Sequence, residues 1–579
     1  MKTKFLPTTR KEMQVRGWEQ LDVILISGDS YIDSPYIGIA VIGRVLENAG
    51  FRVGIIAQPD IKDGKDITRL GEPLLFWGVS GGSVDSMVAN YTASNRKRKR
   101  DDYTPGGEND RRPNRAVIAY TNLIRRNFKN TVPIVLGGIE ASLRRVAHYD
   151  FWSNSVRRSI LFDAKADYLL YGMAEQSVIS LAQNLKNKED LTDLTGLCYI
   201  SKDMPDSHLE LPSYEKVISD KEIFIDMFHT FYRNNDPITA KGLVQQHGNR
   251  FLVQNPPTAY TSQAKLDHIY GLPFQRDLHP HYARQGKVKA LETIKFSINT
   301  HHGCYGECNF CSIAVHEGRT VRWRSQQSIL SEAEILIKSP GFKGYILDIG
   351  GPTANMYGFE CQKKLSTGAC QDKQCLFPET CKALKPNHKP LIKLLKNVRA
   401  LPGIKKVFVG SGIRYDMVLS DKNNGRPYLK EIVEQHVSGQ LKIAPEHTEE
   451  GVLRKMGKPG QKDLIHFKNW FDELTKEAGK DQYLTYYLIA AHPGCTVNDM
   501  QKLKQFTRDK LNISPEQVQL FTPLPSTYSS LMYYTELDPF TLKPIFVEKD
   551  SNKREKQKEI VVKKPAQSPR KPYQKHRRR

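Results

Sequence analysis

Three cysteines stand close together near the middle of the chain, at a spacing that suits an iron–sulfur cluster. Cys304, Cys308 and Cys311 form a Cys-x3-Cys-x2-Cys sequence. Thiolate sulfur is a preferred ligand of both iron–sulfur clusters and zinc. A structural zinc ion normally takes four protein ligands, and a neighbouring histidine would have to complete the set. Three thiolates on a four-iron, four-sulfur cluster instead leave one iron open to bind a further molecule. We therefore expect a [4Fe-4S] cluster here, with zinc as the alternative.

A second group of four cysteines follows shortly after the first. It consists of Cys361, Cys370, Cys375 and Cys381. They lie in an insertion, 355–385, that is much longer than the usual loop between a strand and a helix. Converging thiolates that bind a metal would hold such an insertion together. We expect a second metal site, either zinc or another iron–sulfur cluster. Ordinary reduced thiols in a surface loop are the alternative.

The cysteine groups belong to a segment, 289–540, in which strands and helices alternate. Strands are expected at 293–299, 343–349, 405–409, 440–443, 483–490 and 518–521. Six consecutive strand–helix units are typical of a partial (β/α)6 TIM-like barrel, whose active site lies where loops leave the carboxyl ends of the strands. The first cysteine group follows the first of these strands, and the second group follows the second.

The first 195 residues show the same alternation of short apolar runs and amphipathic helices. Strands are expected at 22–27, 51–58, 74–80, 132–138 and 166–172. This order predicts a doubly wound parallel α/β domain of Rossmann-like type, with glycine-bearing loops where such folds bind ligands. The polar, proline-rich stretch 196–288 is interpreted as a connector between the two α/β domains.

Basic residues are concentrated at the C-terminus. The net charge is +23, and residues 549–579 hold thirteen Lys or Arg against three Asp or Glu. A second basic block, RKRKR, occupies 96–100. We interpret 541–579 as a disordered, solvated tail, with an RNA- or ribosome-contacting arm as the alternative. No apolar run is long enough to cross a membrane and the start of the chain lacks a signal peptide, so a cytoplasmic protein is expected.

The cysteine spacing resembles that of the radical S-adenosylmethionine (SAM) superfamily, in which an aromatic residue such as Phe310 commonly precedes the last cysteine. The longer string HHGCYGECNFCSIAVHEGR, followed by RSQQSIL, is similar to the YgiQ-type radical SAM proteins, an uncharacterised branch. The strings GDSYIDSPYIG, GGIEASLRRVAHYDFW and DIGGPTANMYG share this likeness, which runs over about residues 15–540 and leaves the basic tail outside.

This resemblance implies a reaction and a set of cofactor contacts. The cluster would pass one electron, from a reductant such as flavodoxin or ferredoxin, to bound SAM and so generate a 5′-deoxyadenosyl radical that acts on an unknown substrate. By their positions after the strands, the residues expected to contact SAM are Phe310, Gly350, Gly351, Pro352, Thr353, Ser411, Arg414, Glu446 and His447. Thr353 departs from the family, which often has an acidic residue there. No catalytic residue on the substrate side is identified.

Three other functions compete with this interpretation. The basic tail and the two cysteine groups favour an RNA-modifying enzyme that transfers a methyl or methylthio group, although the N-terminal region holds only Cys198 as a ligand for a further cluster. A cobalamin-dependent methylase would suit the N-terminal α/β domain, but the chain lacks an Asp-x-His-x-x-Gly segment, so the sequence argues against cobalamin. A non-catalytic iron–sulfur protein that binds RNA or the ribosome is the third alternative.

Overall fold

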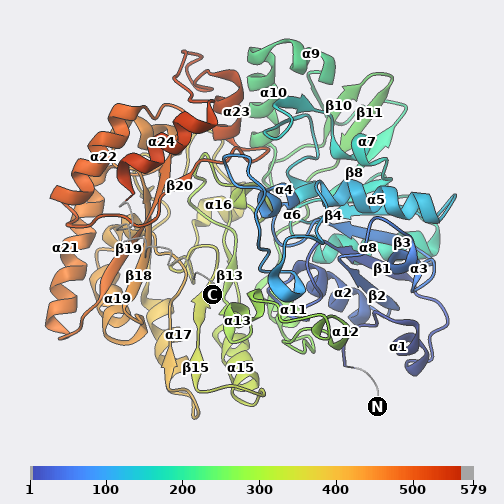
Figure 1. Ribbon diagram of the computed structural model, residues 1–579, viewed down its shortest axis with the longest axis horizontal. Coiled ribbons are helices and arrows are strands. Elements are labelled where there is room, and N and C mark those ends of the chain that lie inside the picture. Colours follow the sequence, from blue (N-terminus) through green and yellow to red (C-terminus); the bar gives the residue numbers. More distant parts are fainter. Residues whose placement is uncertain (1–3, 563–579) are drawn as a thin grey trace, which may run out of the picture.

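A nine-stranded mixed sheet organises the N-terminal half of the protein. The computed structural model describes residues 4–562, of which we call 4–296 the N-terminal half and 297–562 the C-terminal half. The strands lie in the order β2-β1-β3-β4-β7-β8-β11-β10-β9, at the right of Figure 1. Their bounds are β1 Val23–Ser27, β2 Val53–Ala57, β3 Phe76–Ser80, β4 Ile134–Gly137, β7 Tyr168–Leu170, β8 Leu197–Ser201, β9 Leu209–Leu211, β10 Leu243–His247 and β11 Arg250–Gln254.

The first five strands of this order are parallel and buried on both faces, as their apolar sequences predict. Side chains alternate along a strand, so Val23 and Leu25 pack with the helices α2 and α8 while Ile24 and Ile26 pack with α5 on the other face. The helices of this half are α1 Arg10–Val15, α2 Gly38–Asn48, α3 Lys65–Thr68, α4 Ser86–Asn90, α5 Ala116–Asn127, α6 Gly138–Ser142, α7 Ile160–Ala164, α8 Glu175–Asn187, α9 Tyr214–Ser219, α10 Lys221–Arg233, α11 Gln263–Tyr270, α12 Pro280–Ala283 and α13 Ala290–Ile294. The strands β5 His148–Asp150 and β6 Ser155–Arg157 form a separate hairpin.

The sheet does not stop at residue 195, and it is not wholly parallel. Strands β8 and β11 pair antiparallel with their neighbours, and β10 and β9 follow at the edge. Four strands within the stretch expected to be a connector therefore continue the sheet. These strands were not recognised in the sequence, because polar residues such as Gln245 and Gln254 occupy fully buried positions in them. Gln245, for example, accepts a hydrogen bond from the backbone of Ala147 and donates one to Pro212, so a strand forms there without an apolar pattern.

The C-terminal half contains short strands that pair with one another in parallel. Their bounds are β12 Ser297–Asn299, β15 Tyr345–Ile346, β16 Asp348–Gly350, β17 Lys406–Val407, β18 Gln440–Glu446, β19 Tyr483–Ala490 and β20 Gln519–Leu520. Parallel pairing joins β12 to β16, β15 to β17, and β18 to β19 to β20, and one parallel bridge joins Ile413 to Ile443. A strand thus lies within each of the six predicted segments. A small antiparallel pair, β13 His301–His302 and β14 Arg322–Trp323, stands beside them.

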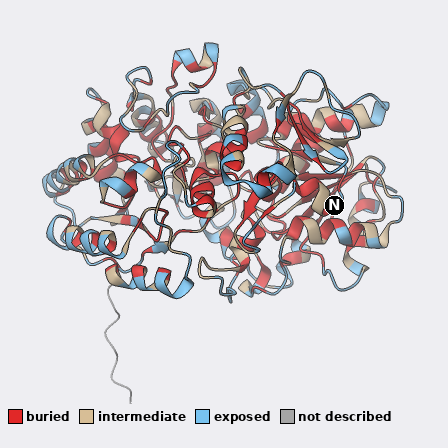
Figure 2. Ribbon diagram, turned by 90° about the horizontal axis from the view of Figure 1, so that it is seen from above, coloured by how far each residue is buried: buried red, intermediate tan, exposed pale blue. Residues whose placement is uncertain are grey.

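Between residues 313 and 535, ten helices accompany these strands. They are α14 Ile313–His316, α15 Gln326–Ile337, α16 Gln362–Thr367, α17 Lys389–Arg399, α18 Tyr415–Ser420, α19 Gly425–Glu431, α20 Glu450–Met456, α21 Gln461–Glu477, α22 Val497–Asp509 and α23 Tyr528–Thr535. Most of them, such as α17, α19, α21 and α22, lie on the outside at the left of Figure 1. Short helical turns at Pro105–Gly107 and Ile432–His436 complete the regular structure of the described residues. In Figure 2 exposed residues lie on the outer helix faces and buried residues fill the interior of both halves.

One hydrophobic cluster contains residues of both halves. Phe521, Tyr528 and Leu531, from the end of the C-terminal half, belong to the same buried cluster as Trp77 of β3 and Leu136 of β4. The hydroxyl of Ser526 also donates a hydrogen bond of 2.8 Å to the carbonyl of Leu143. The last strand–helix unit of the chain therefore packs into the core of the first domain.

The region expected to be a disordered tail begins with ordered structure. Helix α24, Ser551–Val561, packs against α22, β19 and β20. Its Arg554 is only 1% exposed and donates hydrogen bonds to the carbonyls of Phe521 and Ala93. The helix is rich in Lys and Glu, so its sequence shows no clear apolar face by which it could be recognised. Much of its polar contact with the rest of the protein comes from the hydrogen bonds of the buried Arg554. Residues 563–579 lie outside the described part of the chain. Among the residues that are described, no helix has the length and apolar character needed to span a membrane.

Candidate iron–sulfur and cofactor site

The three cysteines lie on one partly buried loop, the cysteine loop (300–312), which follows strand β12. Gly306 lies between two of them, because a Cβ added there would be 3.2 Å from the Cys304 sulfur and 3.5 Å from the Cys308 sulfur. Burial raises the pKa of the Cys311 thiol, and the other two thiols raise it further, which places Cys311 within electrostatic reach of both. The sequence-predicted ligands are thus brought together.

Backbone hydrogen bonds hold the cysteine loop against the C-terminal half. The N–H of Asn309 donates to the carbonyl of Met456 at 2.9 Å, and its side-chain amide donates to Lys455. The carbonyl of Asn309 accepts a bond from the N–H of Ser529. Phe310 packs against the hydrophobic cores of both halves, and its ring meets that of His492 edge to face at 6.4 Å. The loop is therefore fixed where the two halves meet.

The groups around the sulfurs are hydrogen-bond donors. Arg414 is buried and places its guanidinium Nη1 3.5 Å from the sulfur of Cys308, while Asp416 pairs with the same guanidinium. The N–H of Gly306 points at the sulfur of Cys304 at 3.3 Å, and the hydroxyl of Thr353 lies 3.7 Å from it. A cation and N–H donors directed at thiolate sulfur fit iron-bound cysteine, so the residues present suit a cluster.

The glycine loop after strand β16, residues 350–353, lies directly beside the cysteine loop. The carbonyl of Gly350 accepts hydrogen bonds from the N–H and the hydroxyl of Thr300. Gly351 cannot carry a side chain, because a Cβ there would be 2.6 Å from the ring of His301. Ser411 approaches from the neighbouring strand end, where Asp348 accepts hydrogen bonds from its backbone and hydroxyl. Gly350, Gly351, Pro352 and Ser411 all line one cavity.

The last two predicted contacts, Glu446 and His447, occupy different surroundings. Glu446 ends strand β18 with a positive φ of 67°, an uncommon conformation for a residue with a side chain. Burial raises the pKa of its carboxyl, with Lys458 and Arg414 opposing the increase, so it lies within electrostatic reach of the cysteine loop. His447 instead contacts the buried sulfur of Cys495 at 3.6 Å. Burial lowers the pKa of its ring to about 4. The cofactor roles assigned to all these residues stay predictions.

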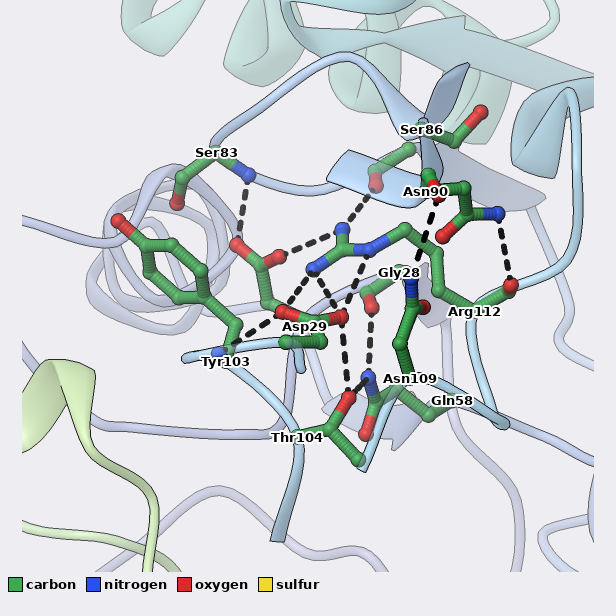
Figure 3. A network of polar contacts seen from close by, with 12 residues as sticks. Gly28, Asp29, Gln58, Ser83, Ser86, Asn90, Tyr103, Thr104, Asn109 and Arg112 are labelled. Atoms are coloured by element: carbon green, nitrogen blue, oxygen red, sulfur yellow. Dashed lines mark hydrogen bonds and ion pairs between the residues drawn. The ribbon is translucent and has the colours of Figure 1, made fainter. Parts of the chain in front are cut away.

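A cavity of about 450 Å³ opens between the two halves, and we call it the interface cavity. One wall is formed by the carboxyl ends of β1, β3, β4 and β7, and the other by His302, helix α14 and the glycine loop. Figure 3 shows how one side of the first wall is fixed. Arg112 pairs with Asp29 at 2.8 Å and with Asp101 at 3.0 Å, and Asp29 accepts a hydrogen bond from the N–H of Ser83.

The glycine-bearing loops of this wall were predicted from the sequence as a place for a ligand, and Gly82, Gly137 and Gly138 do line the cavity. The charged residues Asp29 and Arg112 were not predicted. Asp29 stands in the GDSYIDSP string, whose glycine marks the loop after the first strand, and that signal could have identified it. Its partner Arg112 is far away in the sequence and carries no such signal. The structure is needed to bring the two side chains together.

The second cysteine group packs close to the first. Cys361, Cys375 and Cys381 share a small buried cluster with Cys304 and Tyr305. Burial raises the pKa of the Cys375 thiol to about 11, although the ammonium of Lys364 opposes the change. Cys370 contributes its carbonyl, which accepts a hydrogen bond from Arg319. Within residues 4–562 no three His, Cys, Asp or Glu side chains form a group that could hold a single metal ion. A second metal site stays a prediction.

Comparison with known proteins gives a family and near-full-length relatives. The family model described as "Radical SAM N-terminal" matches residues 5–297. A UPF0313 protein of Fusobacterium nucleatum is 57% identical over 97% of this chain and 99% of its own length. A UPF0313 protein of Thermotoga petrophila is 49% identical over 96% of this chain and 98% of its own length.

Two solved structures were also matched, each at low identity. The radical SAM methyltransferase TsrM from Kitasatospora setae, determined with cobalamin and a [4Fe-4S] cluster, has a TM-score of 0.49 and 16% identity, covering 88% of this chain and 74% of TsrM. The cobalamin-dependent SAM radical enzyme OxsB has a TM-score of 0.49 and 12% identity, covering 91% of this chain and 56% of OxsB. Similarity at this level does not assign cofactors to this chain. The expectation that cobalamin is absent gains no support from it.

Proposed function

Because the chain belongs to the UPF0313 family, the YgiQ-type radical SAM proteins, we propose that it binds a [4Fe-4S] cluster and cleaves SAM reductively. The observation that carries this proposal is the gathering of the Cys304, Cys308 and Cys311 thiols on one buried loop, with the Arg414 guanidinium directed at a sulfur. When bound, such a cluster supplies the electron for SAM cleavage, which yields methionine and a 5′-deoxyadenosyl radical.

In this proposal the residues of the chain bind and orient the cofactors. The three thiolates hold the cluster, and the glycine loop at 350–353 provides backbone groups for SAM next to the open iron. Ser411 and Glu446 stand at neighbouring strand ends, where they are placed to meet the polar groups of SAM. We interpret the six parallel strand segments as a partial barrel, and the burial of the loop at the junction of the two halves as its protection from water.

The test is an anaerobic assay of SAM cleavage. Reconstituted and reduced full-length protein should form 5′-deoxyadenosine, with cell extract as the source of substrate. A Cys308→Ala variant should form none, because one ligand of the cluster is missing. Cys198→Ala is the matched control, since this buried cysteine lies in strand β8 away from the site and its loss should leave cleavage unchanged. Wild-type protein that holds its cluster but forms no 5′-deoxyadenosine would contradict the proposal.

A second candidate function, RNA modification, is favoured by the position of the basic segments. The bond from Arg554 to the carbonyl of Ala93 places helix α24 next to the exposed basic block at 96–100. Residues 563–579, which follow this helix, hold eight Lys or Arg and no acidic residue. We propose that these two basic segments contact one nucleic acid. RNA affinity should then fall with salt more steeply for the full chain than for a chain ending at Val562. Equal salt slopes would exclude the contribution of the tail.

A further inference from the structure

The interface cavity has an unusual balance of charge. Its lining is mainly apolar, with side chains such as Leu25, Leu136 and Ile313. Four carboxylates also line it, and no Lys or Arg does so among the described residues. A cavity with this composition repels phosphate and other anions. It suits a molecule with an apolar body and a positively charged group.

Three of the four carboxylates have partners within the protein. Asp29 pairs with Arg112, as described above. Asp348 accepts hydrogen bonds from the backbone N–H groups of Gly410 and Ser411. Glu317 faces His302 at 3.8 Å and accepts a hydrogen bond from the N–H of Gly303. These three groups are explained by the packing of the loops that carry them.

The fourth carboxylate, that of Glu175, has no such explanation. The residue is 8% exposed, and its carboxyl accepts a hydrogen bond from its own backbone N–H but makes no ion pair or hydrogen bond with another residue of the described part of the chain. Burial raises the pKa of this carboxyl, and His302 nearby opposes only part of the increase. Glu175 is the first residue of helix α8, where an acidic residue is common. Helix position alone does not account for a carboxyl that is buried and lines a cavity.

We propose that the interface cavity binds a small molecule with an apolar body and a protonated amine, and that the amine pairs with Glu175. This inference rests on the proposed function in one respect, since the bound molecule is then the substrate. The cavity is lined by Gly350, Gly351 and Pro352 of the proposed SAM site, so a molecule held by Glu175 lies next to the bound cofactor. An ammonium group on the carboxylate supplies an ion-pair partner, which the described residues do not give Glu175.

Binding of small amines tests the proposal directly. The probes are 2-phenylethylamine and n-hexylamine, compared with 2-phenylethanol and n-hexanol, which have nearly the same shape without the charge. Binding to reconstituted full-length protein is measured by ligand-observed NMR, with SAM present at saturation. We expect at least one amine to bind about tenfold more tightly than its alcohol. The preference should vanish in Glu175→Gln, which keeps the size of the side chain, and persist in Glu189→Gln, an exposed position two residues beyond α8.

Each other outcome overturns the proposal. If no amine binds more tightly than its alcohol, or if Glu175→Gln retains the preference, Glu175 does not recognise a cation. If the amines bind only when SAM is left out of the sample, the cavity belongs to the cofactor and not to a second molecule. The circular dichroism spectrum and melting temperature of Glu175→Gln establish that it is folded. Because SAM cleavage is measured separately, loss of the proposed function and loss of this binding site are distinguishable.

Discussion

Replacement of Arg414 by glutamine should lower the reduction potential of the cluster. Its guanidinium lies 3.5 Å from the sulfur of Cys308 and is buried, so water screens its charge poorly. Reduction adds one negative charge to the cluster and its ligands. A cation beside a ligand sulfur therefore stabilises the reduced state more than the oxidised state, and its removal makes reduction harder.

The size of the shift follows from the strength of the contact. A hydrogen bond to a charged group contributes about 1.5–3 kcal/mol, which for one electron corresponds to about 65–130 mV. Asp416 pairs with the same guanidinium and cancels part of its charge at the sulfur. We therefore expect the lower end of this range, a decrease of about 65 mV.

The assay is a potentiometric titration followed by electron paramagnetic resonance, with iron content measured for each sample. The double variant Arg414→Gln/Asp416→Asn avoids leaving Asp416 buried without its partner and should shift in the same direction. Arg426→Gln is the control, because its pair with Glu473 lies on the surface. An unchanged or higher potential in Arg414→Gln with full iron content would refute the assigned contact.

Three further predictions concern single side chains. Gly351→Ala should weaken SAM binding about tenfold or more, because the new methyl group would lie against the ring of His301; equilibrium dialysis measures this. Arg554→Met should lower the free energy of unfolding by about 2–4 kcal/mol, since it leaves two carbonyls without donors; urea denaturation measures this. Burial alone would raise the pKa of Glu12, but His279 and backbone hydrogen bonds lower it to about 2. Its stabilisation is therefore complete above the unfolded pKa and is lost as pH falls through the folded one. Glu12→Gln should remove roughly 1 kcal/mol of acid-sensitive stability, seen as flatter urea midpoints between about pH 5 and 2.

Matched controls exist for each of these changes. Gly451→Ala adds a methyl group to helix α20 where nothing lies within 4 Å, so SAM binding should not change. Lys553→Met alters the exposed neighbour of the buried arginine and should leave stability unchanged. Glu19→Gln removes an exposed carboxyl and should keep the acid sensitivity of the native protein. A control that changes as much as its partner variant would contradict the mechanism given for that variant.

Features that depend on nearby residues could be predicted from the sequence. The three cysteines lie within a few residues of one another, so their closeness could be predicted, and apolar runs such as VILIS of β1 marked the parallel strands of the first sheet. Strands β10 and β11 were missed because buried glutamines such as Gln245 replace the apolar residues by which strands are recognised. Helix α24 was not predicted, because its sequence is mostly charged and its attachment depends on hydrogen bonds from Arg554 to carbonyls far away in the chain.

The composition of the site depends on contacts across long distances in the sequence. Arg414 was expected to bind SAM because of its place after a strand, yet the structure directs it at Cys308, over a hundred residues earlier. Glu175 had no signal at all, since a single acidic residue at the start of a helix is commonplace. Its burial, and the absence of an ion pair to it among the described residues, become visible only when the two halves come together.

The hydrophobic cluster shared by the two halves also determines how the protein unfolds. Phe521, Tyr528 and Leu531 cannot leave the cluster around Trp77 unless the first domain loses part of its own interior. Arg554 also donates hydrogen bonds to both halves, to the carbonyls of Phe521 and Ala93. The chain should therefore melt in one cooperative transition, and cleavage between the halves should leave both fragments associated. Neither half is then an independent folding unit, although each contains a sheet of its own.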